Sequence, residues 1–122
     1  MTQVKNERSI TIVFPVLNNY NIEIVVAKDV AKARNERDDV YGSYSGHFAA
    51  LHSHNGLGNA CIVFPKSGTS LVDVAHECFH GVRAMMEWAG IEDEEAAAYH
   101  LGYLTKQVYD FVCARSKRSR RR

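Results

Sequence analysis

Two histidines and a glutamate stand at a spacing that can bind and use a metal ion. The residues are His76, Glu77 and His80, within the run His76-Glu77-Cys78-Phe79-His80, an HExxH motif. On a helix, residues four apart lie on the same face, so both imidazoles can converge on one ion. A carboxylate beside them can accept a proton from a metal-bound water and pass it to a leaving amine. The motif predicts a zinc-dependent hydrolase with Glu77 as the general base.

The surrounding sequence predicts that the motif lies in the middle of a helix. Ser70 is followed by Asp73, a capping-box pattern for a helix start, and Gly90 stands where a helix end is expected. Helical periodicity groups a broad apolar stripe, with both histidines at its rim. The stripe comprises Leu71, Val74, Ala75, Cys78, Phe79, Val82, Met85, Met86 and Ala89. The alternative is that both histidines form only ordinary hydrogen bonds.

A third metal ligand is expected from the acidic start of a second helix over residues 92–113. Acidic residues are common in a first helical turn, where they complement the helix dipole. On the helical wheel Glu94 points into the apolar face and Glu95 lies at its rim. We expect the two helices to pack through Ala98 and Gly102 and to bring Glu95 to the metal. Glu94 is the alternative ligand.

These motifs together resemble the zincin metallopeptidases, in particular gluzincins with HExxH and a downstream glutamate. The resemblance is carried by residues 76–80, by Glu95-Ala96-Ala97-Ala98-Tyr99 and by Gly102-Tyr103, and is nearest to small phage- or prophage-encoded proteins. It implies a zinc ion (Zn²⁺) held by His76, His80 and Glu95. The interval from His80 to Glu95 is shorter than in many gluzincins, and the subdomain that usually forms the far wall of the cleft is absent.

The fold expected from this resemblance is a minimal zincin-like α+β domain. Strands are predicted over residues 10–16, 20–26, 47–53 and 60–64, a charged, solvated helix over 29–38, and the two long helices at the end. A small, twisted, mostly antiparallel sheet should pack on the HExxH helix and the C-terminal ligand-bearing helix.

Further site residues follow from the same resemblance, in which substrate adds as an extended strand at the sheet edge. The strand over residues 47–53 is the expected edge, and His52 and His54 could touch the substrate there. Tyr99 is the preferred donor to the oxyanion at the scissile carbonyl, with Tyr103 as the alternative. The alternative is that both are packing residues, as most tyrosines on such a helix are.

Composition fits one domain over residues 1–114, since 122 residues with 46% hydrophobic content suffice for a single core. No apolar run is long enough for a membrane span, and the polar start is unlike a signal peptide. The chain has 3 Cys and no C-x-x-C pair, which argues against a disulfide framework. Cys61 and Cys78 are expected to be packing residues. We therefore expect a cytoplasmic protein.

The C-terminal tail, residues 115–122, carries a separate signal. It holds six of the 15 Lys and Arg residues, so the rest of the chain has nine against 14 acidic residues. Such a tail, expected to be disordered, can bind nucleic acid weakly through phosphates without sequence preference. It could instead be a solubilising end or a clamp on the acidic body of another copy.

Two functions remain open from the sequence. The first is a metallopeptidase that hydrolyses peptide bonds in a peptide or protein substrate, with Glu77 activating the water. The second is a non-catalytic zincin-fold binding protein, a phage-type host-interaction factor with a structural metal. The glutamate in the motif favours the enzyme, whereas the small size of the chain favours the binding protein.

Overall fold

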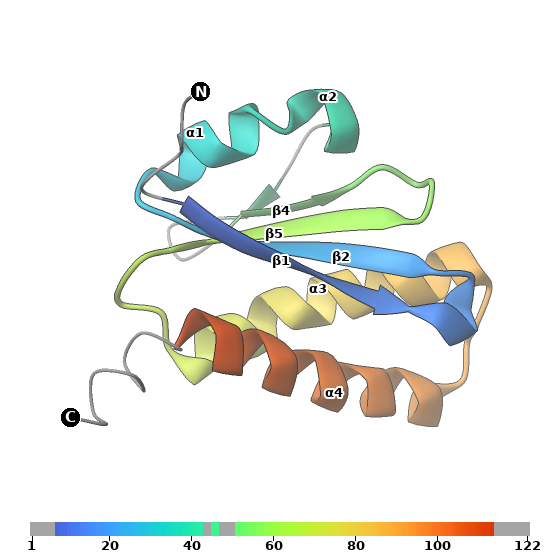
Figure 1. Ribbon diagram of the computed structural model, residues 1–122. Coiled ribbons are helices and arrows are strands. Elements are labelled where there is room, and N and C mark those ends of the chain that lie inside the picture. Colours follow the sequence, from blue (N-terminus) through green and yellow to red (C-terminus); the bar gives the residue numbers. More distant parts are fainter. Residues whose placement is uncertain (1–6, 43–44, 47–50, 114–122) are drawn as a thin grey trace.

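The computed structural model describes residues 7–42, 45–46 and 51–113 and arranges them in three layers (Figure 1). A single sheet lies between two short helices on one face and two long helices on the other. Helices and strands follow one another without regular βαβ repetition, so the predicted α+β class is confirmed. In the described part of the chain, no helix has the length and apolar character to cross a membrane.

The elements follow the predicted order closely. They are β1 (Glu7–Phe14), η1 (Pro15–Leu17), β2 (Tyr20–Ala27), α1 (Val30–Asn35), α2 (Asp38–Tyr41), β3 (Ser45–Gly46), β4 (Leu51–His54), β5 (Asn59–Pro65), α3 (Leu71–Ala89) and α4 (Glu94–Val112).

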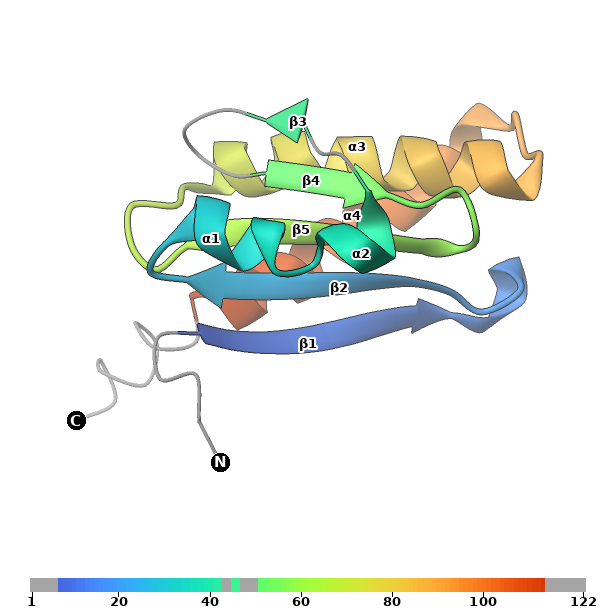
Figure 2. The ribbon, with the colours of Figure 1, turned by 90° about the horizontal axis from the view of Figure 1, so that it is seen from above.

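The sheet has the strand order β1-β2-β5-β4-β3 (Figure 2). All neighbouring strands are antiparallel apart from the central pair β2 and β5, which is parallel, so the mostly antiparallel sheet is confirmed. The prediction that residues 47–53 form an edge strand is wrong, because β4 (Leu51–His54) is flanked on its outer side by β3. Residues 47–50 lie outside the described residues.

The two central strands are covered on both faces. Ile22, Ile24 and Ile62 belong to the core under α3 and α4, whereas Val25 and Val63 belong to the smaller core under α1 and α2. Strands buried on both faces have nearly continuous apolar sequences, as β2 and β5 do. The larger core is therefore the surface on which the motif helix is seated.

The charged segment at residues 29–38 differs from the predicted solvated helix. It divides into α1 and α2, and Arg34 is fully buried, with its guanidinium donating to the carbonyl oxygen of Gly42. Arg37 forms ion pairs with Glu7 at 3.0 Å and Glu23 at 3.4 Å. The prediction failed because long arginine side chains can bury their stems against a sheet while the charged heads find partners.

The ends of α3 were predicted correctly. Ser70 and Asp73 form the reciprocal capping box, and Gly90 has the left-handed conformation that closes the helix (φ 71°). The second long helix begins two residues later than expected, at Glu94, because Asp93 caps it by accepting from the amide of Ala96.

The expected contact between the long helices through Ala98 and Gly102 is wrong. Both residues are exposed, and a Cβ atom at Gly102 would have no neighbour within 4 Å. The close approach instead involves Gly81, where a Cβ would lie 3.8 Å from Leu104 Cδ2. The bulkier residues Leu104 and Val108 occupy the core position on α4 that Ala98 and Gly102 were expected to fill.

Candidate functional site

The two motif histidines lie side by side on α3. Their ring centroids are 4.9 Å apart at an interplanar angle of 78°. Two imidazoles on one tetrahedral zinc, with Zn–N bonds of about 2.0–2.1 Å, have ring centres about 5 Å apart. The side chain of His76 is largely exposed and that of His80 is half-buried. The pair therefore has the separation and access that a shared metal ion requires.

Glu77 occupies the sheet-facing side of the same helical turn. It is 3% exposed, and its Oε2 atom lies 4.0 Å from Nε2 of His76. A carboxylate is rarely this buried unless it is paired or functional, since removing its charge from water is costly. The structure thus places a buried acidic group beside the histidine pair.

A hollow of about 300 Å³ opens beside His80, on the side of α3 that faces β4. It is lined by His54, Phe79, His80, Arg83, Ala84 and Glu87. Arg83 and Glu87 are not among the site residues that the sequence predicts. Because they follow His80 by three and seven residues, they lie on the same face of α3 as His80. Helical periodicity could therefore have predicted that they lie near it.

The predicted third ligand is not brought to this hollow. Cys78 of α3 lies next to Thr105 of α4, and Gly81 lies close to Leu104, so these pairs mark the register of the two antiparallel helices. Counting the same number of residues from Cys78 forward along α3 and from Thr105 back along α4 places Glu95 level with Trp88 along the helix axes. Since a helix rises about 1.5 Å per residue, Trp88 lies about 12 Å beyond His80 along α3. Donor atoms of ligands that share one zinc ion lie only about 3–4 Å apart.

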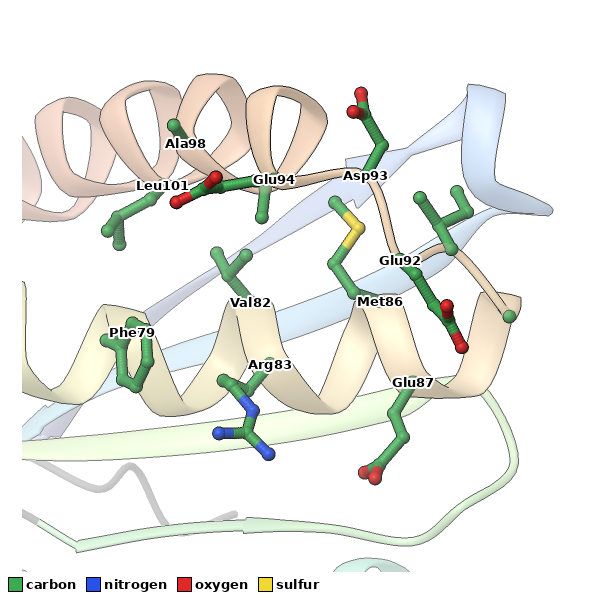
Figure 3. A pocket seen from close by; sticks show the side chains of 13 residues that line it. Phe79, Val82, Arg83, Met86, Glu87, Glu92, Asp93, Glu94, Ala98 and Leu101 are labelled. Atoms are coloured by element: carbon green, nitrogen blue, oxygen red, sulfur yellow. The ribbon is translucent and has the colours of Figure 1, made fainter.

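Glu94, the alternative ligand, lies in a different groove. This groove of about 540 Å³ runs between α3 and α4 (Figure 3). Val82 and Met86 point from α3 toward α4, and the side chain of Glu94 runs along α4 toward Leu101. Among the described side chains, no three His, Cys, Asp or Glu residues are grouped closely enough to hold a metal. The zinc site remains a prediction with two of its ligands placed together.

The tyrosines predicted as oxyanion donors lie elsewhere. Tyr99 is 81% exposed and lines a hollow with Pro15 and Tyr103, beside the end of β1. The ring of Tyr103 contacts Phe14 edge-on, with centroids 5.9 Å apart. The structure therefore does not bring Tyr99 into the hollow beside His80.

The two cysteines expected to be packing residues are buried, as predicted. Burial raises the pKa of the Cys61 thiol to about 12. Burial likewise raises the pKa of Cys78 to about 12, against a lowering by its hydrogen bond to Thr105. Both thiols stay protonated at neutral pH, and a protonated thiol is a poor metal ligand.

Comparison of the chain with protein-family models, curated proteins and solved structures finds no match. The resemblance to zincins therefore stays a prediction from the sequence motifs.

Proposed function

We propose that this protein is a zinc-dependent peptidase whose metal is held by His76 and His80. The observation that carries the proposal is the imidazole pair, whose 4.9 Å separation suits two ligands of one tetrahedral ion. A zinc ion bound there would lower the pKa of a coordinated water to about 7.

Glu77 is proposed as the group that moves the proton. Its carboxylate is adjacent to the ligand pair and held on a rigid helix, so it can accept a proton and return it to the leaving amine. Burial of the side chain limits competition from bulk water. Histidine ligation leaves Glu77 outside the coordination sphere, where a general base must be.

The test combines metal content with hydrolysis of a denatured protein substrate. The wild-type protein should retain zinc and cleave, whereas Glu77→Gln should retain zinc and lose activity by about 10²–10⁴-fold. Glu36→Gln provides a matched control, because Glu36 is an exposed carboxylate beside α1 on the opposite face of the sheet. Absence of zinc after refolding with excess metal, or undiminished cleavage by Glu77→Gln, would overturn the proposal.

A second candidate function, non-catalytic binding, is favoured by the groove between α3 and α4. Its floor is apolar, and Glu87, Glu92, Asp93 and Glu94 outnumber Arg83 at its rim. Such a groove suits an amphipathic segment of a partner with basic residues beside its apolar face. The chain's own basic tail is a poor occupant because residues 115–122 contain no large apolar side chain.

Binding of a synthetic Leu/Lys amphipathic peptide, followed by fluorescence anisotropy, tests this second candidate. Glu92→Lys with Glu94→Lys should weaken it about tenfold or more, whereas Glu36→Lys should not. No binding, or equal binding of a Leu/Glu peptide, would reject the candidate.

The cytoplasm, where thiols stay reduced, is the proposed location of the protein.

A further inference from the structure

The proposed metal site needs a third protein ligand. Zinc centres that activate water usually have three protein ligands and leave the fourth position for the water. Helix α3 supplies His76 and His80, and the register of the long helices leaves Glu95 about two turns away along the helix axis. The missing ligand must come from another element that lies against the histidine-bearing side of α3.

Strand β4 is that element. His54 and His80 line the same hollow, and His54 is exposed, so its ring can turn without disturbing the core. In the sheet register, position 54 pairs with Ala60 and position 52 pairs with Ile62. Ala60 and Ile62 both belong to the core beneath α3 and α4. Both histidine positions of β4 therefore belong to the sheet face that carries the motif helix.

Positions 52 and 54 of β4 lie next to different turns of α3. Figure 2 shows β4 and α3 running in the same direction. The hollow that contains His54 extends along α3 from Phe79 to Glu87. Two residues of strand, about 6.6 Å, correspond to about four residues of helix, so position 52 lies level with the motif turn. The strand thus offers one histidine at the height of the motif and one beside the hollow.

We infer that strand β4 completes the metal site with a histidine, His52 or His54, in place of the glutamate on α4. This inference rests on the metal binding of the proposed function and specifies its ligand set as three imidazoles. Three histidines form neutral ligands that leave the ion its full positive charge, which favours ionisation of a bound water. They also keep Glu77 out of the ligand set, beside the histidine pair.

Zinc affinity of the full chain, measured by competition with a chromophoric chelator, tests the inference. His52→Ala or His54→Ala should weaken binding about 100-fold, whereas Glu95→Gln should leave it within about twofold of wild type. His100→Gln is the matched control, because His100 hydrogen-bonds to the Ala96 carbonyl within α4 and packs on Phe14. A thermal melt of each metal-free variant separates ligand loss from unfolding.

Cobalt(II) substitution gives a second readout that does not depend on loss of function. A cysteine placed at the ligating position, by His52→Cys or His54→Cys, should produce a thiolate-to-cobalt charge-transfer band that the wild type lacks. The native thiols Cys61, Cys78 and Cys113 are present in the wild type and in both variants, so the wild-type spectrum gives the baseline.

The outcomes distinguish this inference from the proposed function. A wild-type protein that binds no zinc would overturn both. Zinc binding that survives both β4 substitutions, without a charge-transfer band in either cysteine variant, would overturn the β4 ligand alone. Strong loss on Glu95→Gln would do the same and would return the third ligand to α4.

Discussion

Replacing Gly81 with alanine should stabilise the protein, because the site beneath the motif helix has room for a methyl group. A Cβ atom at Gly81 would lie 3.5 Å from Ile22 Cδ1, 3.6 Å from Ile62 Cδ1 and 3.8 Å from Leu104 Cδ2, all ordinary van der Waals distances. Alanine is favoured over glycine inside a helix by about 0.8–1.0 kcal/mol. Burial of one methyl group adds up to about 0.8 kcal/mol.

The expected gain in the free energy of unfolding is therefore about 1–2 kcal/mol, or a rise of about 4–8 °C in Tm. Circular dichroism during heating and during urea titration measures it. Gly102→Ala, which gains no contact, should give only the helix-propensity part, about 1 kcal/mol. Gly58→Ala should destabilise, since Gly58 has φ 102° and its Cβ would meet Trp88 at 3.2 Å.

A lower free energy of unfolding for Gly81→Ala, alongside the expected gain for Gly102→Ala, would refute this reasoning. It would mean that α3 approaches β2 and β5 more closely than the geometry at Gly81 indicates.

Three further predictions concern the thiols and the tail. Because burial raises the pKa of Cys61 and Cys78 to about 12, the unfolded state loses thiol protons first, so stability is full below about pH 9 and falls as pH rises toward 12. Urea titrations should show a steeper decline for wild type than for Cys61→Ala, and equal slopes would contradict the assignment. In the native state Ellman's reagent should label the half-buried Cys113 fastest, with Cys61 and Cys78 reacting only on unfolding; simultaneous labelling would count against their burial. Deleting residues 115–122 should abolish any DNA or RNA binding that weakens steeply with salt and leave Tm nearly unchanged, whereas a large drop in Tm would show that the tail belongs to the domain.

Features encoded by neighbouring residues could be predicted from the sequence. The capping box of Ser70 and Asp73 and the glycine end at Gly90 operate within one or two helical turns, so their sequence patterns define α3 without reference to the rest of the fold. The spacing of His76 and His80 likewise predicts their proximity, because four residues make about one helical turn.

The position of Glu95 could not be predicted in the same way. A helical wheel gives the angle of a residue around its axis, but it does not give the height at which a neighbouring helix passes. That height depends on where α3 ends and α4 begins, and on which side chains meet, such as Cys78 and Thr105. A long α3 and a short connection therefore separate Glu95 from the motif although their sequence interval is short.

The ion pairs on the other face of the sheet could not be predicted from local sequence patterns either. Arg37 joins Glu7 and Glu23, which come from two different strands. Nothing in the sequence around any one of them indicates the others, because the contact exists only once β1 and β2 pair and α1 packs over them. Only the three-dimensional register reveals such long-range partners.

The central parallel pair determines when the candidate site can form during folding. Strand β2 pairs with β5 from Asn21 opposite Asn59 to Ala27 opposite Pro65, so the chain between them must close as a loop before the sheet is continuous. Gly81 lies over side chains from both strands, Ile22 and Ile62, and α3 has no complete surface to dock on until that loop has closed. A peptide cut from α3 would keep the spacing of the motif histidines but would lack both the hollow and β4. Metal affinity of the whole chain should therefore appear with its tertiary structure and not with its helix content.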